Sequence, residues 1–194
     1  MKLTKWKVAF FLLLGSVIAA IGLVFFLVLL PSDAEKPVLA EVEGETAFHV
    51  TSSKAELNQL VTYYLEKEAG NAPIDYDVYI GEEVELYGSF PVFGTDIDYY
   101  MTFVPEAMED GNIVLRQEGL RVGLLDIPAS YVLKTADSAY AFPEWVHVVP
   151  EEQRIYVSLG EMRLDNGMRV KAESFNLKED DIRFAVLLPE GATQ

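Results

Sequence analysis

Residue types that commonly carry enzyme chemistry are few in this chain. It contains two histidines, His49 and His147, about a hundred residues apart, and we interpret each as structural because neither has metal-ligand spacing. Ser130 lacks the Gly-x-Ser-x-Gly turn that exposes a nucleophilic serine. Cysteine is absent, which excludes disulfides, thiolate catalysis and thiolate metal ligands. We therefore expect no catalytic residues and no enzyme.

Acidic residues cluster at Glu82-Glu83-x-Glu85 and at Glu179-Asp180-Asp181. Such clusters bind calcium when their spacing follows a known ligand loop, and neither does. Solvated turns are the favoured interpretation, so no metal and no cofactor is expected. A hydrolase that uses an unrecognised pair of carboxylates is kept as the third functional hypothesis, because abundant carboxylates alone are a weak argument for acid–base catalysis.

Apolar side chains are the more informative set. Alternation along residues 95–104 places Tyr99, Met101 and Phe103 on one face of a predicted strand. Helical spacing places Val132, Leu133 and Ala136 on one face of a predicted helix. These six residues are our candidates for lining an apolar groove that holds an acyl chain. A fully packed core is the alternative, and the sequence favours neither.

Two amphipathic helices are predicted to position these faces. Ser53 and Glu56 form a capping box, which predicts a helix from Lys54 to about residue 69, before Gly70. The second helix follows Pro128, a residue suited to a first helical turn, and ends before Pro143.

Alternating segments between and after these helices predict an antiparallel sheet. Segments with strand character lie at residues 47–50, 76–80, 83–90, 95–104, 113–120, 145–149, 154–159, 168–177 and 181–188. Turns are expected at Gly81 and at residues 109–112, and Asn166-Gly167 predicts a hairpin between the segments on either side of it. The expected class is α+β, with two helices packed on a curved antiparallel sheet of about seven strands.

A separate signal lies before this domain. Residues 8–30 contain no charged side chain, and 17 of these 23 residues are Leu, Val, Ile or Phe. As a helix they would span roughly 34 Å, enough for a bilayer core, with an insertion free energy of about −5 to −10 kcal/mol. We predict a transmembrane signal anchor. A cleaved signal peptide is the rival, but it would normally have a shorter apolar region and a small-residue cleavage site.

Charge asymmetry orients the predicted anchor. Lys2, Lys5 and Lys7 precede it, whereas Asp33 and Glu35 follow it. The positive-inside rule then gives a cytoplasmic basic tail at residues 1–7, an anchor at 8–30, a linker at 31–45 and an extracytoplasmic α+β domain at 46–194. We expect a single-pass protein of the cell membrane whose anchor contacts the lipid bilayer.

The outer portion, residues 31–194, is strongly acidic. It holds 12 basic and 31 acidic residues, a formal charge of −19. Such a surface repels nucleic acid at long range, so no nucleic-acid partner is expected.

The chain resembles the YpmS family of low-GC Gram-positive bacteria, whose function is unknown. The resemblance covers nearly the whole chain, and its most specific segments are IPASYVL at 127–133, PEWVHV at 143–148, LDNGM at 164–168, VKA at 170–172 and NLKEDDI at 176–182. It carries over no catalytic residue. The outer domain is also similar to tubular lipid-binding (TULIP) folds, in which a helix and a curved sheet enclose an apolar groove; this is an analogy of fold.

These observations lead to a first hypothesis, a non-enzymatic anchored domain that binds or passes a lipid or lipid-linked envelope precursor in an apolar groove. The alternative is a protein-interaction scaffold for envelope enzymes or assembly factors, which would use its acidic surface or an exposed sheet edge.

Overall fold

The computed structural model contains two compact units, Met1–Ala34 and Glu35–Gln194. The described residues are 16, 18, 19, 37, 39, 41–42, 44–68, 76–92, 95–123, 127–139, 142–162 and 167–189. In the first unit these residues are helical. Within the described part of the chain, no helix is both long enough and apolar enough to span a bilayer. The predicted cytoplasmic tail lies outside the described residues. The predicted anchor also lies outside them, except for Ser16, Ile18 and Ala19.

Two helices are confirmed in the second unit. Helix α2 covers Lys54–Glu68 and helix α3 covers Ala129–Ala139. The predicted capping box starts α2: the Ser53 N–H donates to the Glu56 carboxylate at 2.8 Å, and the Glu56 N–H donates to Ser53 Oγ at 3.3 Å. These bonds to Ser53 hold the pKa of Glu56 below its ordinary value, the backbone N–H contributing most.

All segments with strand character form strands. Their bounds are β1 Thr46–Ser52, β2 Tyr76–Ile80, β3 Val84–Val92, β4 Thr95–Ala107, β5 Ile113–Val122, β6 Val146–Val149, β7 Arg154–Val157, β8 Arg169–Asn176 and β9 Asp181–Leu187. A short 3₁₀ helix, η2 at Pro150–Glu152, joins β6 to β7. The described residues thus form nine strands, and the predicted number of about seven is too low.

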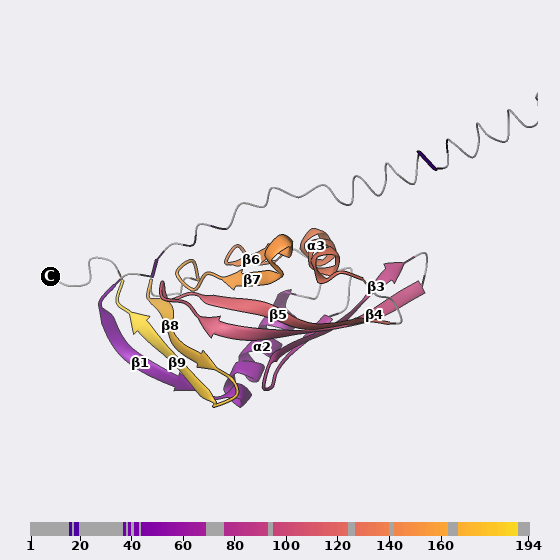
Figure 1. Ribbon diagram of the computed structural model, residues 1–194. Helices are drawn as coiled ribbons and strands as arrows, with labels where there is room; N and C mark the ends of the chain where they lie inside the picture. The colour runs from indigo at the N-terminus through magenta and orange to yellow at the C-terminus, as the bar shows by residue number, and fades with distance from the viewer. Residues whose placement is uncertain are drawn as a thin grey trace, which may run out of the picture. The chain divides into compact units, whose positions relative to one another are not determined.

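The strands form two antiparallel sheets, which corrects the prediction of one sheet. The larger has the order β2-β3-β4-β5-β7-β6, and the smaller has the order β1-β9-β8 (Figure 1). The predicted hairpin at Asn166-Gly167 is therefore wrong, since β7 and β8 belong to different sheets. Alternation along a segment predicts a strand but does not state which strand it pairs with.

Both sheets are curved, and Figure 1 shows the smaller sheet bent beside the end of β4 and the start of β5. Irregular register between Thr102 and Phe103, and between Ala172 and Ser174, adds the local bending that bulges produce. The sheets are joined where the Ala172 N–H donates to the Gly111 carbonyl at 2.7 Å.

The main apolar core lies between the helices and both sheets. Met101 and Phe103 of β4, Leu133 of α3 and Ile182 of β9 are at most 1% exposed, and Leu57 of α2 packs against the same cluster. The fold is therefore two helices on curved antiparallel sheets, which confirms the α+β class.

Two residues of the predicted linker pack on the domain. Val42 is buried with Ala185 and Leu187, and its N–H donates to the Asp110 carbonyl at 3.0 Å. Leu39 packs against a cluster that contains Tyr156. These contacts fix the start of the domain beside the turn between β4 and β5.

Candidate functional site

The structure brings most of the predicted groove residues into one cluster. Tyr99, Met101 and Phe103 on β4 and Val132 and Leu133 on α3 are all buried in the main core. Ala136, one turn further along α3, is half-buried. The two apolar faces that the sequence predicted, one on β4 and one on α3, therefore meet in one buried cluster.

This interior is closed in the structure. Met101, Phe103 and Leu133 are each 1% exposed, and Val132 is 3% exposed. Leu57 and Val61 of α2 cover the same cluster from their helix. An acyl chain would enter only after some of these side chains move.

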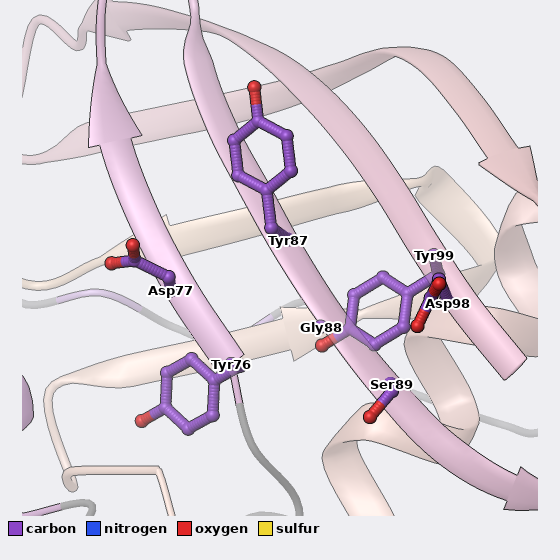
Figure 2. A pocket seen from close by; sticks show the side chains of 7 residues that line it. All are labelled: Tyr76, Asp77, Tyr87, Gly88, Ser89, Asp98 and Tyr99. Carbon is purple, nitrogen blue, oxygen red and sulfur yellow. The ribbon is translucent and has the colours of Figure 1, made fainter. Parts of the chain in front are cut away.

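Sequence reasoning missed a shallow hollow on the larger sheet. It has a volume of ≈ 640 Å³, and three adjacent strands supply its lining (Figure 2). The lining residues are Tyr76, Asp77, Tyr87, Gly88, Ser89, Asp98 and Tyr99. The lining residues thus include three tyrosines, two aspartates and one serine, and they differ in chemistry from the apolar interior.

The hollow lies where β2 begins. The β2–β3 register starts with Tyr76 opposite Gly88, whereas β3 and β4 stay paired as far as Val92 opposite Thr95. Strand alternation directs Tyr76 and Tyr99 to the core face of the sheet, and Asp77, Tyr87, Ser89 and Asp98 to the opposite face. Among the described residues the β2–β3 pairing ends at Tyr76 opposite Gly88, and the hollow lies at this corner of the sheet.

Tyr99 belongs to both the interior and the hollow. It is 5% exposed within the core cluster and also lines the hollow. Its ring fills the space over Gly88, where an added Cβ would lie 2.5 Å from the Tyr99 hydroxyl oxygen and 2.6 Å from Cζ. Glycine at position 88 therefore permits this ring position, and the ring separates the hollow from the core.

Tyr87 is held in place by its neighbours. Its hydroxyl donates to the Glu85 carboxylate, and the Tyr100 hydroxyl donates to the same group at 3.3 Å. The Tyr87 and Tyr100 rings lie 4.8 Å apart at 41°. The hydrogen bond to Glu85 raises the pKa of Tyr87, so its hydroxyl stays protonated and neutral.

The remaining titratable candidates are apart from this hollow. His49 Nδ1 lies 2.9 Å from Glu173 Oε2, and His147 Nε2 lies 3.3 Å from Glu161 Oε2, both in solvent-accessible pairs. Ser130 is half-buried in the first turn of α3. Within the described residues, no group of three or more His, Asp or Glu side chains is placed to hold a metal ion.

The sequence contains only a weak signal for the hollow, which does not distinguish its residues from other surface residues. Asp98 and Ser89 lie on the polar face of their alternating strands, as many surface residues do. Only the register brings them beside Tyr76 and Asp77, because β2 and β4 are both paired with β3.

The fold and site define a class: two helices on curved antiparallel sheets, with a buried apolar interior and a shallow polar hollow. A family model described as "Uncharacterized protein conserved in bacteria (DUF2140)" matches residues 4–188. The chain is 41% identical to the "Uncharacterized protein YpmS" of Bacillus subtilis (strain 168) over 97% of this chain and 100% of that protein. It therefore belongs to the YpmS (DUF2140) family. No solved structure matches it.

Proposed function

We propose that this protein is a non-enzymatic, membrane-anchored domain that binds or passes a lipid or a lipid-linked envelope precursor. The observation that carries the proposal is the convergence of the strand face at Tyr99, Met101 and Phe103 with the α3 face at Val132 and Leu133. Helix α3, helix α2 and the curved sheet then surround an interior without charged side chains among its buried cluster residues. The acyl chain would replace contacts inside this interior.

The proposed location supports such a role. The uncharged run at residues 8–30 and the lysines before it favour an anchor with the domain outside the cell. Leu39 and Val42 pack on the domain, so only a short stretch separates them from the end of the apolar run at Leu30. A short tether keeps a binding domain at high effective concentration near its membrane ligand.

The test compares two tryptophan substitutions on α3. Ala136→Trp places a large ring on the helix face that meets the interior, and Asp137→Trp places it on an exposed position as a control. If the interior yields to an acyl chain, Ala136→Trp should abolish binding of a fluorescent fatty-acid probe to the outer domain with little change in melting temperature. Asp137→Trp should retain binding.

A rigid, filled core would give the opposite result in melting temperature and in probe binding. Overpacking at Ala136 would then cost about 1–3 kcal/mol and lower the melting temperature. That result, with no probe binding by the unsubstituted domain, would reject the lipid proposal.

A second candidate is an interaction scaffold for an envelope enzyme or assembly factor, and strand β1 favours it. In the described residues β1 pairs with β9 alone and forms the edge of the smaller sheet. Ala47 to Thr51 are all exposed, Phe48 by 50%, and β1 contains no Asp, Glu, Lys or Arg. Edge strands of this type accept an added strand from a partner.

A further inference from the structure

Strand β1 differs from the other edge strands of the described sheets because it is uncharged and is exposed from Ala47 to Thr51 (Figure 1). Strand β2 carries Asp77, β8 carries Arg169, Lys171 and Glu173, and no residue of β6 is exposed. Charged side chains on an edge strand deter pairing with another chain, and β1 has none. About every second residue of β1 directs its N–H and carbonyl away from β9, so an added strand can pair with this edge.

The apolar face of the smaller sheet continues to this edge. Phe48 lies opposite Val186 and Val50 lies opposite Phe184 in the β1–β9 register. Val186 is buried, and Phe184 packs against a buried cluster. Phe48 and Val50 themselves are 50% and 37% exposed. A further strand beside β1 would remove this apolar surface from water, which is favourable.

His49 lies between these two residues in sequence, on the opposite face of the sheet. Its Nδ1 lies 2.9 Å from the Glu173 carboxylate of β8, and β9 lies between β1 and β8. The ring is therefore drawn across β9, away from the free edge. The register irregularity of β1 lies at its start, between Thr46 and Phe48, so the strand is regular from Phe48 to Ser52.

A second copy of this chain fits the chemistry of β1. Residues 31–194 hold 12 basic and 31 acidic residues, so two copies repel each other over most of their surface. At the uncharged β1 they can meet without opposing carboxylates. If His49 of one copy lies opposite His49 of the other, antiparallel pairing places each Phe48 opposite Val50 of the second copy. An aromatic residue opposite a β-branched one is a favourable cross-strand pair, and both pairs would lie on the apolar face.

We propose that two copies of this protein associate by antiparallel β1–β1 pairing about a two-fold axis at His49. Both copies use the same strand, so the contact is isologous and closes at two copies. One pair of strands buries less surface than a stable soluble complex needs, and a shared membrane raises the local concentration of anchored copies. The inference therefore rests on the proposed anchor, but it does not depend on lipid binding.

The absence of natural cysteines allows a clean cross-linking test. A single cysteine replaces His49, Val50 or Thr51 in the full-length chain, which is reconstituted in lipid vesicles, recovered by flotation and oxidised with copper phenanthroline. Around an axis at His49, equivalent Cα atoms lie about 5 Å apart at position 49, about 8 Å at position 50 and about 14 Å at position 51. A disulfide needs Cα atoms within about 7 Å.

We therefore expect His49→Cys to form disulfide-linked dimers at least about tenfold faster than Thr51→Cys, with Val50→Cys between them. Ser138→Cys, at an exposed position on α3, measures random collision in the same vesicles. The His49 side chain is 67% exposed, so the folded domain should tolerate its replacement. Melting temperatures identify any variant that fails to fold.

A charge exchange at the axis gives an independent test. His49→Glu and His49→Lys each place like charges opposite one another, so each alone should lose energy transfer between fluorophores attached to the carboxyl termini of the copies. An equal mixture of the two variants should restore energy transfer. Ser138→Glu and Ser138→Lys should give the same energy transfer alone as when mixed.

The outcomes separate this inference from the proposed function. A disulfide maximum at a position other than 49, rates no higher than the collision background, or charge variants that associate as the parent does would overturn the β1–β1 pairing. The fatty-acid probe tests the lipid function separately, so that function would survive such a result. A chain that does not float with the vesicles would reject the proposed anchor and, with it, the association of anchored copies.

Discussion

Ser53 and Glu56 are the residues for which sequence alone predicted a contact. Both partners lie within one helical turn, so their bonds depend on local backbone geometry and not on the rest of the fold. Tyr99 is the opposite case. Its place on a buried face followed from alternation, but the position of its ring over Gly88 depends on the register of β3 and β4. Local patterns carry no information about that register.

At this scale we predict that the capping box stabilises the domain in a pH-dependent way. Ser53→Ala removes the Ser53 Oγ acceptor for the Glu56 N–H and should lower the free energy of unfolding by about 1 kcal/mol. Because the folded pKa of Glu56 is lowered, the carboxylate stabilises the fold above its unfolded pKa and loses this effect as the pH falls through its folded pKa.

Urea unfolding of the parent and of Glu56→Gln, at neutral pH and in acid below the ordinary pKa of glutamate, measures the second effect. The difference between the two proteins should shrink in acid. Glu82→Gln, in the exposed turn between β2 and β3, is the control. A difference that is the same at both pH values would contradict the assigned role of the Glu56 carboxylate.

At the scale of elements, the Asn58 side chain of α2 forms hydrogen bonds with edge strand β2 of the larger sheet. The Asn58 amide donates to the Ile80 carbonyl, and its oxygen accepts from the Ile80 N–H, each at 2.8 Å. The amide thus pairs with β2 as a neighbouring strand would. Amphipathic spacing predicted the helix, but a polar residue on its inner half was not predicted to bind a strand 22 positions away.

We predict that Asn58→Ala destabilises the domain by about 1–3 kcal/mol, because it leaves both Ile80 backbone groups without this partner. Thr62→Ala is the matched control on the same helix, since its hydroxyl bonds only to the Asn58 carbonyl of its own helix, at 2.9 Å, among the described contacts. Chemical unfolding measures both. Equal, small losses in the two variants would show that the Asn58 pairing contributes little.

At the scale of the whole molecule, the sequence predicted the α+β class and each strand segment but not the division into two sheets. Strands β8 and β9 pair through a local turn, whereas β1 joins β9 from the far end of the domain. This long-range pairing leaves no periodic signal. The result is a curved enclosure in which α2, α3 and both sheets meet around Met101, Phe103 and Ile182. We propose that this enclosure holds a lipid chain.

The most direct measurement of that assignment is mass spectrometry of the lipids that the domain carries. A protease site inserted between Ala34 and Pro37 would release the outer domain from its native membrane before purification and extraction. We predict one lipid class in near-stoichiometric amount, and its depletion in Ala136→Trp but not in Asp137→Trp. Finding no lipid, or the same mixed membrane lipids in all three proteins, would contradict the account and favour the scaffold.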